Sequence, residues 1–278
     1  MSLLSPSDVR ALAASIDFKP TKRWGQNFVV DANTVRRLVT LSGVQPGETV
    51  LEIGPGFGSL TLGLLEAGAS VIAVEIDLAL ARLLPRTVAK HVPAANNNLL
   101  VIPADAMHLA SANMPTLDRL VANLPYNIAV PVLLHLLSEF DTIAGGLVMV
   151  QLEVAQRLTA LPGSRVYGAP SAKLAWYAEA ELAGTVPASV FWPVPNVESG
   201  LVRFTRRAPV SPTPRELVFA VIDAAFAQRR KMLRSALAVL TDATKLESVG
   251  IDPTARGETL SIEQFAAIAS SFTVEKLP

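Results

Sequence analysis

The chain has 278 residues, of which 50% are apolar and 17% are charged, and its formal net charge at pH 7 is zero. This length accommodates one large and one small domain with a well-buried core. No apolar run reaches the ~18 residues of a membrane-spanning helix, and residues 1–17 carry Asp8 and Arg10 in place of the uninterrupted apolar core of a secretory signal. We therefore expect a cytoplasmic protein without a membrane partner.

Residues that commonly hold metals are scarce in the sequence. The chain has no cysteine, which excludes disulfides, thiolate zinc sites and cysteine nucleophiles. The histidines His91, His108 and His135 lie far apart and match no ligand spacing. We therefore predict no metal site.

Residues 49–146 alternate between apolar runs and segments with helical spacing, a pattern typical of a parallel sheet flanked by helices. The predicted strands are 49–53, 70–75, 99–102, 119–122 and 146–151. The predicted helices between them are 60–67, which Gly68 ends, 78–89 and 130–137. Two later strands, 173–182 and 199–204, flank a proline-rich segment and are expected to add antiparallel members to the sheet.

The last part of the chain changes character at residues 206–214, which contain three prolines and are predicted to be a linker. Helical patterns follow at 216–227, 230–240, near Lys245 and at 262–270, and Ser261 with Gln264 forms a capping box for the last helix. The predicted fold class is α/β, with a Rossmann-like domain over residues 1–205 and a small all-helical domain over residues 206–278.

Four predicted strands end at residues suited to ligand binding. Gly54 follows the first strand, Glu75 ends the second, Asp105 follows the third and Asn123 follows the fourth. In open α/β sheets, ligands bind beyond the carboxyl ends of the strands, near the point where the strand order reverses. We therefore expect these four residues to border one site.

The loop at residues 54–59 reads Gly-Pro-Gly-Phe-Gly-Ser. Gly54 and Gly56 allow close approach of the backbone to a ligand, Glu75 can accept hydrogen bonds from both hydroxyls of a ribose, and Asp105 can accept one from an adenine amine. A dinucleotide enzyme would require a third glycine or alanine at the position of Ser59 and a pyrophosphate on the next helix. The loop therefore favours a phosphate-free cofactor, S-adenosylmethionine, over a dinucleotide, and a purely structural turn is the third interpretation.

The tetrapeptide Asn123-Leu124-Pro125-Tyr126 has the parts needed to hold a planar base that carries an amine. Two acceptors, the side-chain oxygen of Asn123 and the backbone carbonyl of Leu124, can bind the amine hydrogens and aim the nitrogen lone pair at a sulfonium methyl. Pro125 fixes the turn, and Tyr126 can stack on the base. Alone, such a tetrapeptide is more often a strand-ending turn. After a Gly-Pro-Gly loop in this strand order, it indicates methyl transfer to a nucleobase amine, with positioning as the main catalytic effect.

A base inside a nucleic-acid helix cannot enter such a pocket, so the target must be single-stranded or flipped out. The segment Phe-Trp-Pro-Val-Pro at 191–195 offers a second aromatic wall for such a base, with Phe191 as the candidate for stacking. The alternative is that these aromatic side chains belong to the core of a crossover connection.

Basic residues are concentrated in two stretches in spite of the neutral net charge. One stretch is Lys19, Lys22 and Arg23, beside Trp24. The other runs from residue 203 to 234 and has only Glu216 and Asp223 as acidic members, against Arg203, Arg206, Arg207, Arg215, Arg229, Arg230, Lys231 and Arg234. Such patches can bind a phosphate backbone locally, and the alternative is a solvated cationic face.

Along nearly its whole length the chain resembles the KsgA-type ribosomal RNA adenine dimethyltransferases. Besides the glycine loop and the tetrapeptide, the resemblance rests on Lys-Arg-Trp-Gly-Gln-Asn-Phe at 22–28, Gln-Leu-Glu-Val-Ala-Gln-Arg at 151–157, Phe-x-Pro-x-Pro-x-Val-x-Ser at 191–199 and Phe-Ala-Gln-Arg-Arg-Lys-Met-Leu at 226–233. It implies a Rossmann-like methyltransferase sheet and S-adenosylmethionine-dependent dimethylation of two adjacent adenosines near the 3′ end of small-subunit ribosomal RNA.

The resemblance also implies roles for particular residues and a partner. Asn27 and the backbone of Val29 would contact the cofactor, together with the glycine loop, Glu75, Asp105 and Asn123. The helical domain, with Arg229, Arg230 and Lys231, would grip an immature small ribosomal subunit, and we expect the protein to act as a monomer. A role in subunit biogenesis separate from catalysis is also implied.

Three alternatives remain open. The first is an adenine methyltransferase of large-subunit RNA that confers antibiotic resistance, which Leu124 and the Gly-Pro-Gly loop disfavour because those relatives tend to have Asn-Ile-Pro-Tyr and a different loop. The second is a DNA adenine methyltransferase, for whose sequence-reading domain the tail leaves little room. The third is an assembly checkpoint factor whose essential role is to bind immature subunits.

Overall fold

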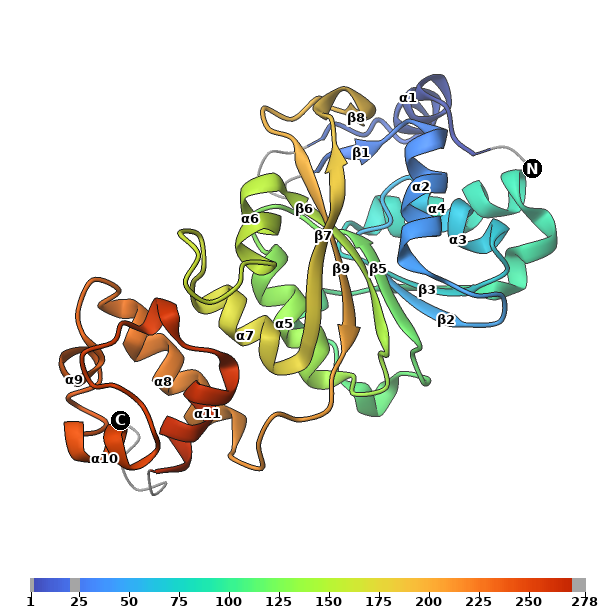
Figure 1. Cartoon of the computed structure of the whole chain (residues 1–278). Coiled ribbons are helices and arrows are strands. Elements are labelled where there is room, and N and C mark those ends of the chain that lie inside the picture. Colours follow the sequence, from blue (N-terminus) through green and yellow to red (C-terminus); the bar gives the residue numbers. More distant parts are fainter. Residues whose placement is uncertain (1–2, 21–25, 272–278) are drawn as a thin grey trace. The chain divides into compact units, whose positions relative to one another are not determined.

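The computed structural model of the chain describes residues 3–20 and 26–271 (Figure 1). Two compact units emerge, one formed by Met1–Ala155 and Glu181–Thr205 and the other by Gln156–Ala180 and Arg206–Pro278. One boundary between the units falls between Thr205 and Arg206. Residues 156–180, which the sequence pattern had placed with the first domain, group with the second unit.

Seven strands form the main sheet, in the order β4-β3-β2-β5-β6-β9-β7. Their bounds are Thr49–Ile53 for β2, Ser70–Glu75 for β3, Leu99–Pro103 for β4, Arg119–Asn123 for β5, Gly145–Gln151 for β6, Ala178–Val186 for β7 and Ser199–Arg206 for β9. The strands β4, β3, β2, β5 and β6 pair in parallel, and β9 pairs with β6 in antiparallel register. The predicted Rossmann-like α/β class is confirmed, and so is the antiparallel addition of β9.

The strand order reverses between β2 and β5. From β2 the chain runs outward through β3 to β4, and it then returns to place β5 on the other side of β2. The carboxyl ends of β2 and β5 therefore border the crevice where α/β sheets bind ligands.

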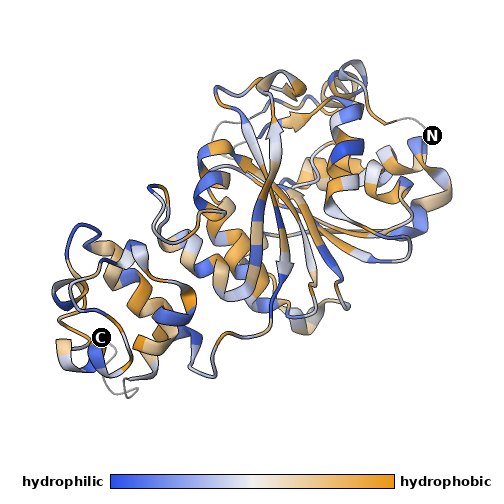
Figure 2. Ribbon diagram, viewed as in Figure 1, coloured by the Kyte–Doolittle hydropathy of each residue, from blue (hydrophilic) through white to orange (hydrophobic). Residues whose placement is uncertain are grey.

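Helices cover both faces of this sheet (Figure 1). On one face, alternate strand residues such as Val50, Val71 and Leu147 share an apolar core with buried residues of four helices, α1 (Pro6–Ser15), α2 (Ala32–Ser42), α3 (Ser59–Glu66) and α4 (Leu78–His91). On the other face lies α5 (Ala129–Glu139), and α6 (Leu152–Leu158) follows β6. Figure 2 shows hydrophobic residues running along the central strands, as expected for a sheet covered on both sides.

The helix ends follow from local sequence chemistry. Asp31 caps α2 by accepting a hydrogen bond from the Thr34 amide at 2.6 Å, and Gly43, with φ of 68°, ends the helix. Asp77 caps α4 in the same way. Gly68, with φ of 85°, follows the end of α3, as predicted.

Short 3₁₀ turns fill the remaining connections of the first unit. They are η2 (Pro93–Asn98), η3 (Ala106–His108), η4 (Ser111–Asn113) and η5 (Ala188–Val190). Among the described residues, no helix is both long and apolar enough to cross a membrane.

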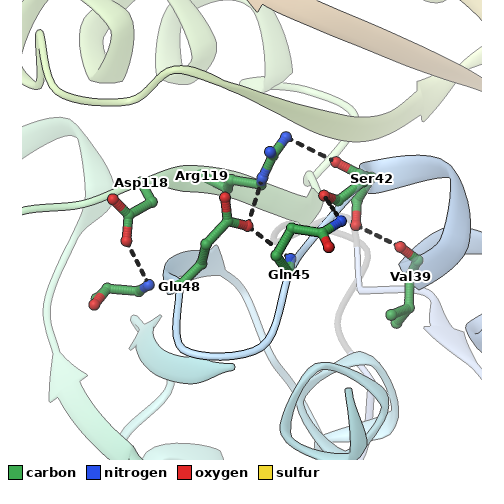
Figure 3. Close-up of polar contacts among 8 residues, drawn as sticks. Val39, Ser42, Gln45, Glu48, Asp118 and Arg119 are labelled. Carbon is green, nitrogen blue, oxygen red and sulfur yellow. Dashed lines mark hydrogen bonds and ion pairs between the residues drawn. The ribbon is translucent and has the colours of Figure 1, made fainter. Parts of the chain in front are cut away.

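A polar network joins the amino ends of β2 and β5 (Figure 3). The Arg119 side chain donates to the Glu48 carboxylate at 2.6 Å and to the carbonyl of Ser42 at 3.3 Å. The Asp118 carboxylate accepts a hydrogen bond from the Thr49 amide at 2.7 Å. These bonds tie the end of α2 to both central strands, at the edge of the sheet opposite the strands' carboxyl ends.

A separate two-stranded sheet joins segments that lie far apart in the sequence. Strand β1 (Phe28–Val29) pairs in antiparallel register with β8 (Phe191–Trp192), so that Phe28 lies opposite Trp192 and Val29 opposite Phe191. Phe57 from the glycine loop packs against Phe28, with ring centroids 4.6 Å apart. The β1–β8 sheet thus brings the segments around residues 28 and 191 to the glycine loop.

The second unit has its own apolar core, formed from α7 (Ala169–Tyr177), α8 (Arg215–Ala227), α9 (Leu233–Ala236), α10 (Ala243–Ser248) and α11 (Ile262–Ser270). The turn η6 (Gly257–Thr259) precedes α11. The predicted capping box of Ser261 and Gln264 is present at the start of α11. The buried Tyr167 hydroxyl donates to the Leu260 carbonyl at 2.9 Å.

Two predicted elements are wrong. Residues 173–177 belong to helix α7, and strand β7 begins only at Ala178, because Pro170 and the bond from the Gly168 amide to the Ser171 hydroxyl start a helix just upstream. The predicted helix 230–240 is reduced to α9. The amides of Leu233 and Arg234 donate to carbonyls of residues 255 and 253, so no helix continues through them from residue 230.

Candidate active site

A pocket lies at the carboxyl ends of β2, β3, β4 and β5, where the strand order reverses. The glycine loop, the start of α3 and the segment around β1 complete its wall. The described lining residues are Gln26, Asn27, Phe28, Val29, Glu52, Ile53, Gly54, Pro55, Phe57, Ser59, Leu60, Val74, Glu75, Ile76, Leu80, Ala104, Asp105, Ala106, Asn123, Leu124, Pro125, Tyr126 and Ile128.

Glu75 is held at the pocket by backbone amides. Its carboxylate accepts hydrogen bonds from the amides of Gly56 and Asp77, both at 3.0 Å. Burial raises its pKa, although the two amide bonds oppose the rise. The carboxylate therefore has a fixed orientation at the end of β3.

Gly56 occupies a position that excludes a side chain. Its φ is 57°, and an added Cβ would lie 2.5 Å from the ring of Phe28. The close packing of loop and ring keeps β1 against the pocket.

A second buried carboxyl, that of Glu52, also lines the pocket and is 1% exposed. It accepts a hydrogen bond from the Thr61 hydroxyl at 2.7 Å. The pKa of Glu52 is raised to about 8, mainly by burial; the Thr61 bond opposes the rise, and the nearby carboxyl of Glu75 contributes to it. The hydroxyl of Ser59, also on the wall, is buried without a hydrogen-bond partner among the described residues.

The ionisable groups of the described wall are all acidic. Its described members include three carboxyl groups, those of Glu52, Glu75 and Asp105, and none of the described lining residues is basic. A pyrophosphate requires donors and positive charge. The described wall instead suits a cationic or neutral ligand with hydroxyl and amino groups.

Asn123 connects β5 to the segment before β1. The side-chain nitrogen of Asn123 donates to the Asn27 carbonyl at 2.8 Å. This bond orients the Asn123 amide so that its oxygen, Oδ1, can act as an acceptor. The next residue, Leu124, is anchored by its amide, which donates to the Met149 carbonyl at 3.0 Å. The two residues that carry the acceptors predicted from the sequence thus line the pocket, and each is anchored by a hydrogen bond.

Tyr126 lies half-buried on the same wall. Its hydroxyl forms a 2.7 Å hydrogen bond with the hydroxyl of Ser199, the first residue of β9. Burial raises the pKa of Tyr126, and the Ser199 bond opposes the rise. The phenol is therefore neutral at physiological pH.

Asp105 closes the far side of the pocket, after β4. One of its oxygens accepts a hydrogen bond from the Met107 amide at 2.9 Å, which starts η3. Ile76, directly after Glu75, lines the pocket with a side chain that is 49% exposed. An acidic group and an exposed apolar side chain on one wall are suited to an adenine ring and its amine.

Most residues predicted from the sequence to bind a ligand meet at this pocket, namely Asn27, Val29, Gly54, Glu75, Asp105, Asn123, Leu124, Pro125 and Tyr126. Gly56 lies behind the wall and holds Glu75. Phe191 does not line the pocket: it is 2% exposed and belongs to the core through the β1–β8 sheet, so the stacking role predicted for it has no support in this structure.

Five of the predicted basic residues, namely Lys22, Arg23, Arg229, Arg230 and Lys231, divide into three groups. Lys22 and Arg23, with Trp24, lie outside the described residues. In the second unit, Arg230 and Lys231 are exposed. Arg229 is also exposed, but its side chain binds the Glu258 carboxylate at 2.8 Å and the Arg165 carbonyl at 2.6 Å.

The sequence patterns missed several residues of the pocket and its support. Glu52, Ser59 and Ile76 line the wall, and Ser199 holds Tyr126. One signal was available for Glu52, because an acidic residue within the otherwise apolar strand 49–53 has to be buried. Nothing local to Ser199 indicates a partner 73 positions away in the sequence.

Known proteins are similar to this chain over nearly its whole length. The sequence profile of the family described as "Ribosomal RNA adenine dimethylase" matches residues 17–273. A "Ribosomal RNA small subunit methyltransferase A" of Thermobifida fusca is 57% identical and covers 96% of this chain and 95% of its own length. The protein of the same name from Streptomyces coelicolor is 55% identical and covers 96% of each chain.

Solved structures have the same fold. A dimethyladenosine transferase from Plasmodium falciparum matches with a TM-score of 0.75 and 21% identity, over 87% of this chain and 95% of that one. The 23S rRNA methyltransferase ErmE matches with a TM-score of 0.66 and 25% identity, over 88% and 98% of the two chains. Since the family profile covers nearly all of the sequence, the chain belongs to the ribosomal RNA adenine dimethylase family.

Proposed function

We propose that the protein transfers methyl groups from S-adenosylmethionine to the exocyclic amines of two adjacent adenosines near the 3′ end of small-subunit ribosomal RNA. The observation that carries the proposal is the position of Asn123 and Tyr126 on the same pocket wall as Glu75 and Asp105. The name of the Thermobifida fusca relative, at 57% identity, supports the small subunit as the substrate.

S-adenosylmethionine is the cofactor, and the described wall fits it. The fixed Glu75 carboxylate would hold the ribose hydroxyls, Asp105 the adenine amine, and Gly54 with Asn27 the amino-acid part. The carboxyl groups of Glu75 and Asp105 on the wall favour a positively charged ligand. When bound, the cofactor supplies a methyl group on a sulfonium centre, which leaves as a neutral thioether.

The protein's main chemical task is to prepare the target amine. The lone pair of an adenine amine is delocalised into the ring, which makes the nitrogen a weak nucleophile. Oδ1 of Asn123 and the carbonyl of Leu124 would accept its two hydrogens and favour a tetrahedral nitrogen with its lone pair directed at the methyl group. Alignment of this kind accounts for much of the rate of displacement reactions between bound groups.

The ring of Tyr126 would stack on the target base and hold it beside these acceptors. Such a base is single-stranded or flipped out of its helix. The exposed Arg230 and Lys231 of the second unit would contact phosphates of an immature small subunit. We propose that the two units divide these tasks, that the protein works as a monomer, and that it acts in the cytoplasm, where subunits assemble.

The direct test is to incubate the purified protein with radiolabelled S-adenosylmethionine and immature small subunits that lack the modification, and to map the label by nuclease digestion. We expect dimethyladenosine in the small-subunit RNA. Asn123→Ala is expected to lower kcat about 100-fold or more, as does the loss of one positioned hydrogen-bonding group in other enzymes.

Large-subunit RNA and duplex DNA, added in parallel, separate the alternatives. Label in either of them, with none in the small subunit, would contradict the proposed substrate but not the chemistry. If Asn123→Ala lacks transferase activity yet restores subunit assembly in cells, the checkpoint role is the essential one. Asn98→Ala, an exposed asparagine ahead of β4, is the matched control and should behave as the wild type.

A further inference from the structure

The hydrogen bond between Tyr126 and Ser199 joins two segments that are 73 residues apart. Ser199 is fully buried, at 0% exposure, and its hydroxyl lies 2.7 Å from that of Tyr126. Tyr126 is half-buried and forms part of the pocket wall. One end of this bond is therefore inside the protein, and the other belongs to the side chain that faces the target base.

The backbone that carries Ser199 is rigid. Ser199 lies opposite Gln151 in the antiparallel pairing of β9 with β6. The next residue, Gly200, is packed so closely that an added Cβ would lie 2.4 Å from the Cβ of Ala155. The pairing and the packing hold this backbone in place, and the side chain of Ser199 is fully buried, so its hydroxyl has little room to move.

A tyrosine ring turns about two torsions, χ1 and χ2. The phenolic oxygen lies on the axis about which χ2 turns the ring, so a bond at this atom restricts χ1 and with it the position of the ring. An error of ~1 Å in the placement of a reacting group can lower a rate about 100-fold. The position of the Tyr126 ring decides where a stacked adenine presents its amine to Asn123, so the restraint bears on the reaction itself.

We propose that Ser199 is a positioning residue, which fixes the ring of Tyr126 so that a stacked adenine presents its amine to Asn123. This inference rests on the proposed function of the same pocket. It gives a role to the last residue of the Phe-x-Pro-x-Pro-x-Val-x-Ser pattern, whose first aromatic residue lies in the core.

The kinetic test compares Ser199→Ala, Tyr126→Phe and the double variant with the wild type on immature small subunits. Each single change removes the same bond, so each should lower kcat about tenfold, and the double variant should be no slower than the single ones. The KM for the subunit and the Kd for S-adenosylmethionine should stay within about twofold, because the bond restrains only the ring that holds the base. Tyr126→Phe removes the bond without altering the buried strand, which keeps the test valid if Ser199→Ala folds poorly.

Ser42→Ala is the matched control. Ser42 is also buried, at 2% exposure, but its hydroxyl binds the Val39 carbonyl within α2. This variant should lose stability and keep its kcat. If the role of Ser199 were purely structural, Ser199→Ala would likewise lose stability and keep its kcat, and this result would overturn the proposal. Losses of kcat in the two single variants that multiply in the double variant would also overturn it.

A second readout does not depend on catalysis. The chain has three tyrosines, and the other two, Tyr167 and Tyr177, lie in the second unit. With isotope-labelled tyrosine rings, Ser199→Ala should shift and broaden the NMR signals of Tyr126 alone. Unchanged Tyr126 signals would refute the restraint itself, whereas altered signals in a protein whose wild type methylates no RNA would refute only the proposed function.

Discussion

Glu52 keeps a carboxyl group inside the protein, beside a second carboxyl on the pocket wall. Its pKa rises from an ordinary 4.5 to about 8, mainly because burial disfavours the charged form. Below pH 4.5 both the folded and the unfolded chain hold this proton. Between pH 4.5 and 8 the unfolded chain releases it and the folded chain retains it, so the free energy of unfolding falls as pH rises.

We predict that Glu52→Gln removes this dependence. Without cofactor, the wild type should lose as much as about 4 kcal/mol relative to Glu52→Gln between pH 5 and 8, as measured by urea unfolding at several pH values. Glu66→Gln, an exposed change at the end of α3, serves as the control. Parallel curves for the wild type and Glu52→Gln would show that Glu52 is ionised in the folded protein.

At the scale of single residues, the sequence predicted which residues end the strands. Gly54, Glu75, Asp105 and Asn123 were placed together because the carboxyl ends of parallel strands meet at one edge. Ser199 could not be predicted, because its partner is set by the pairing of β9 with β6. Phe191 was misplaced, since an aromatic residue beside prolines gives no sign of which of its faces is buried.

Strand β1 is held against the glycine loop by close packing between Gly56 and Phe28. We predict that Gly56→Ala pushes the Phe28 ring, and with it Asn27, away from the pocket. The Kd for S-adenosylmethionine, measured by calorimetry, should rise more than about tenfold, which corresponds to ~1.4 kcal/mol of lost binding free energy.

The variant Gly47→Ala distinguishes the effect of this clash from the effect of backbone strain, which Gly56→Ala combines. Gly47 also has a positive φ, of 88°, but an added Cβ there would meet nothing within 4 Å. Both variants should lose about 1 kcal/mol of stability because alanine disfavours this conformation. Only Gly56→Ala should weaken cofactor binding, and equal Kd values for the two variants would refute the clash.

The strands of the parallel sheet were predicted almost to the residue, because each is a short apolar run bounded by glycine or polar residues. The sequence patterns did not predict helices α1, α2 and α6. They also placed residues 173–182 in one strand, whereas residues 173–177 belong to α7 and β7 begins at Ala178. The pairing of β1 with β8 was beyond prediction. Each strand has only two residues, and tertiary contacts rather than local propensity determine them.

At the scale of the whole molecule, the net charge is zero, but basic residues are concentrated in particular stretches of the chain. Arg230 and Lys231 are exposed, and no acidic group among the described residues forms an ion pair with either. We predict that Arg230→Ala with Lys231→Ala weakens binding to small-subunit RNA at every salt concentration. The slope of log Kd against log salt should fall by about 2, one for each lost phosphate contact.

Arg203→Ala is the control for this prediction. Arg203 lies on β9 of the first unit, and its charge is already paired with Glu181. Its loss should leave the salt dependence unchanged. Arg229→Ala is a poorer probe, because it also breaks the bonds to Glu258 and Arg165 and is expected to lower stability. An unchanged slope in the double variant would assign the basic residues of the second unit to a solvated surface.

The β1–β8 sheet has a consequence for protein synthesis. The segment that carries Asn27 leaves the ribosome early, but its partner strand is not made until residue 192, and the support of Tyr126 not until residue 199. A nascent chain therefore cannot assemble its cofactor pocket until about seven tenths of its residues have been joined. A translation product interrupted before residue 199 would lack the means to modify RNA, so the fold itself restricts activity to chains that extend at least that far.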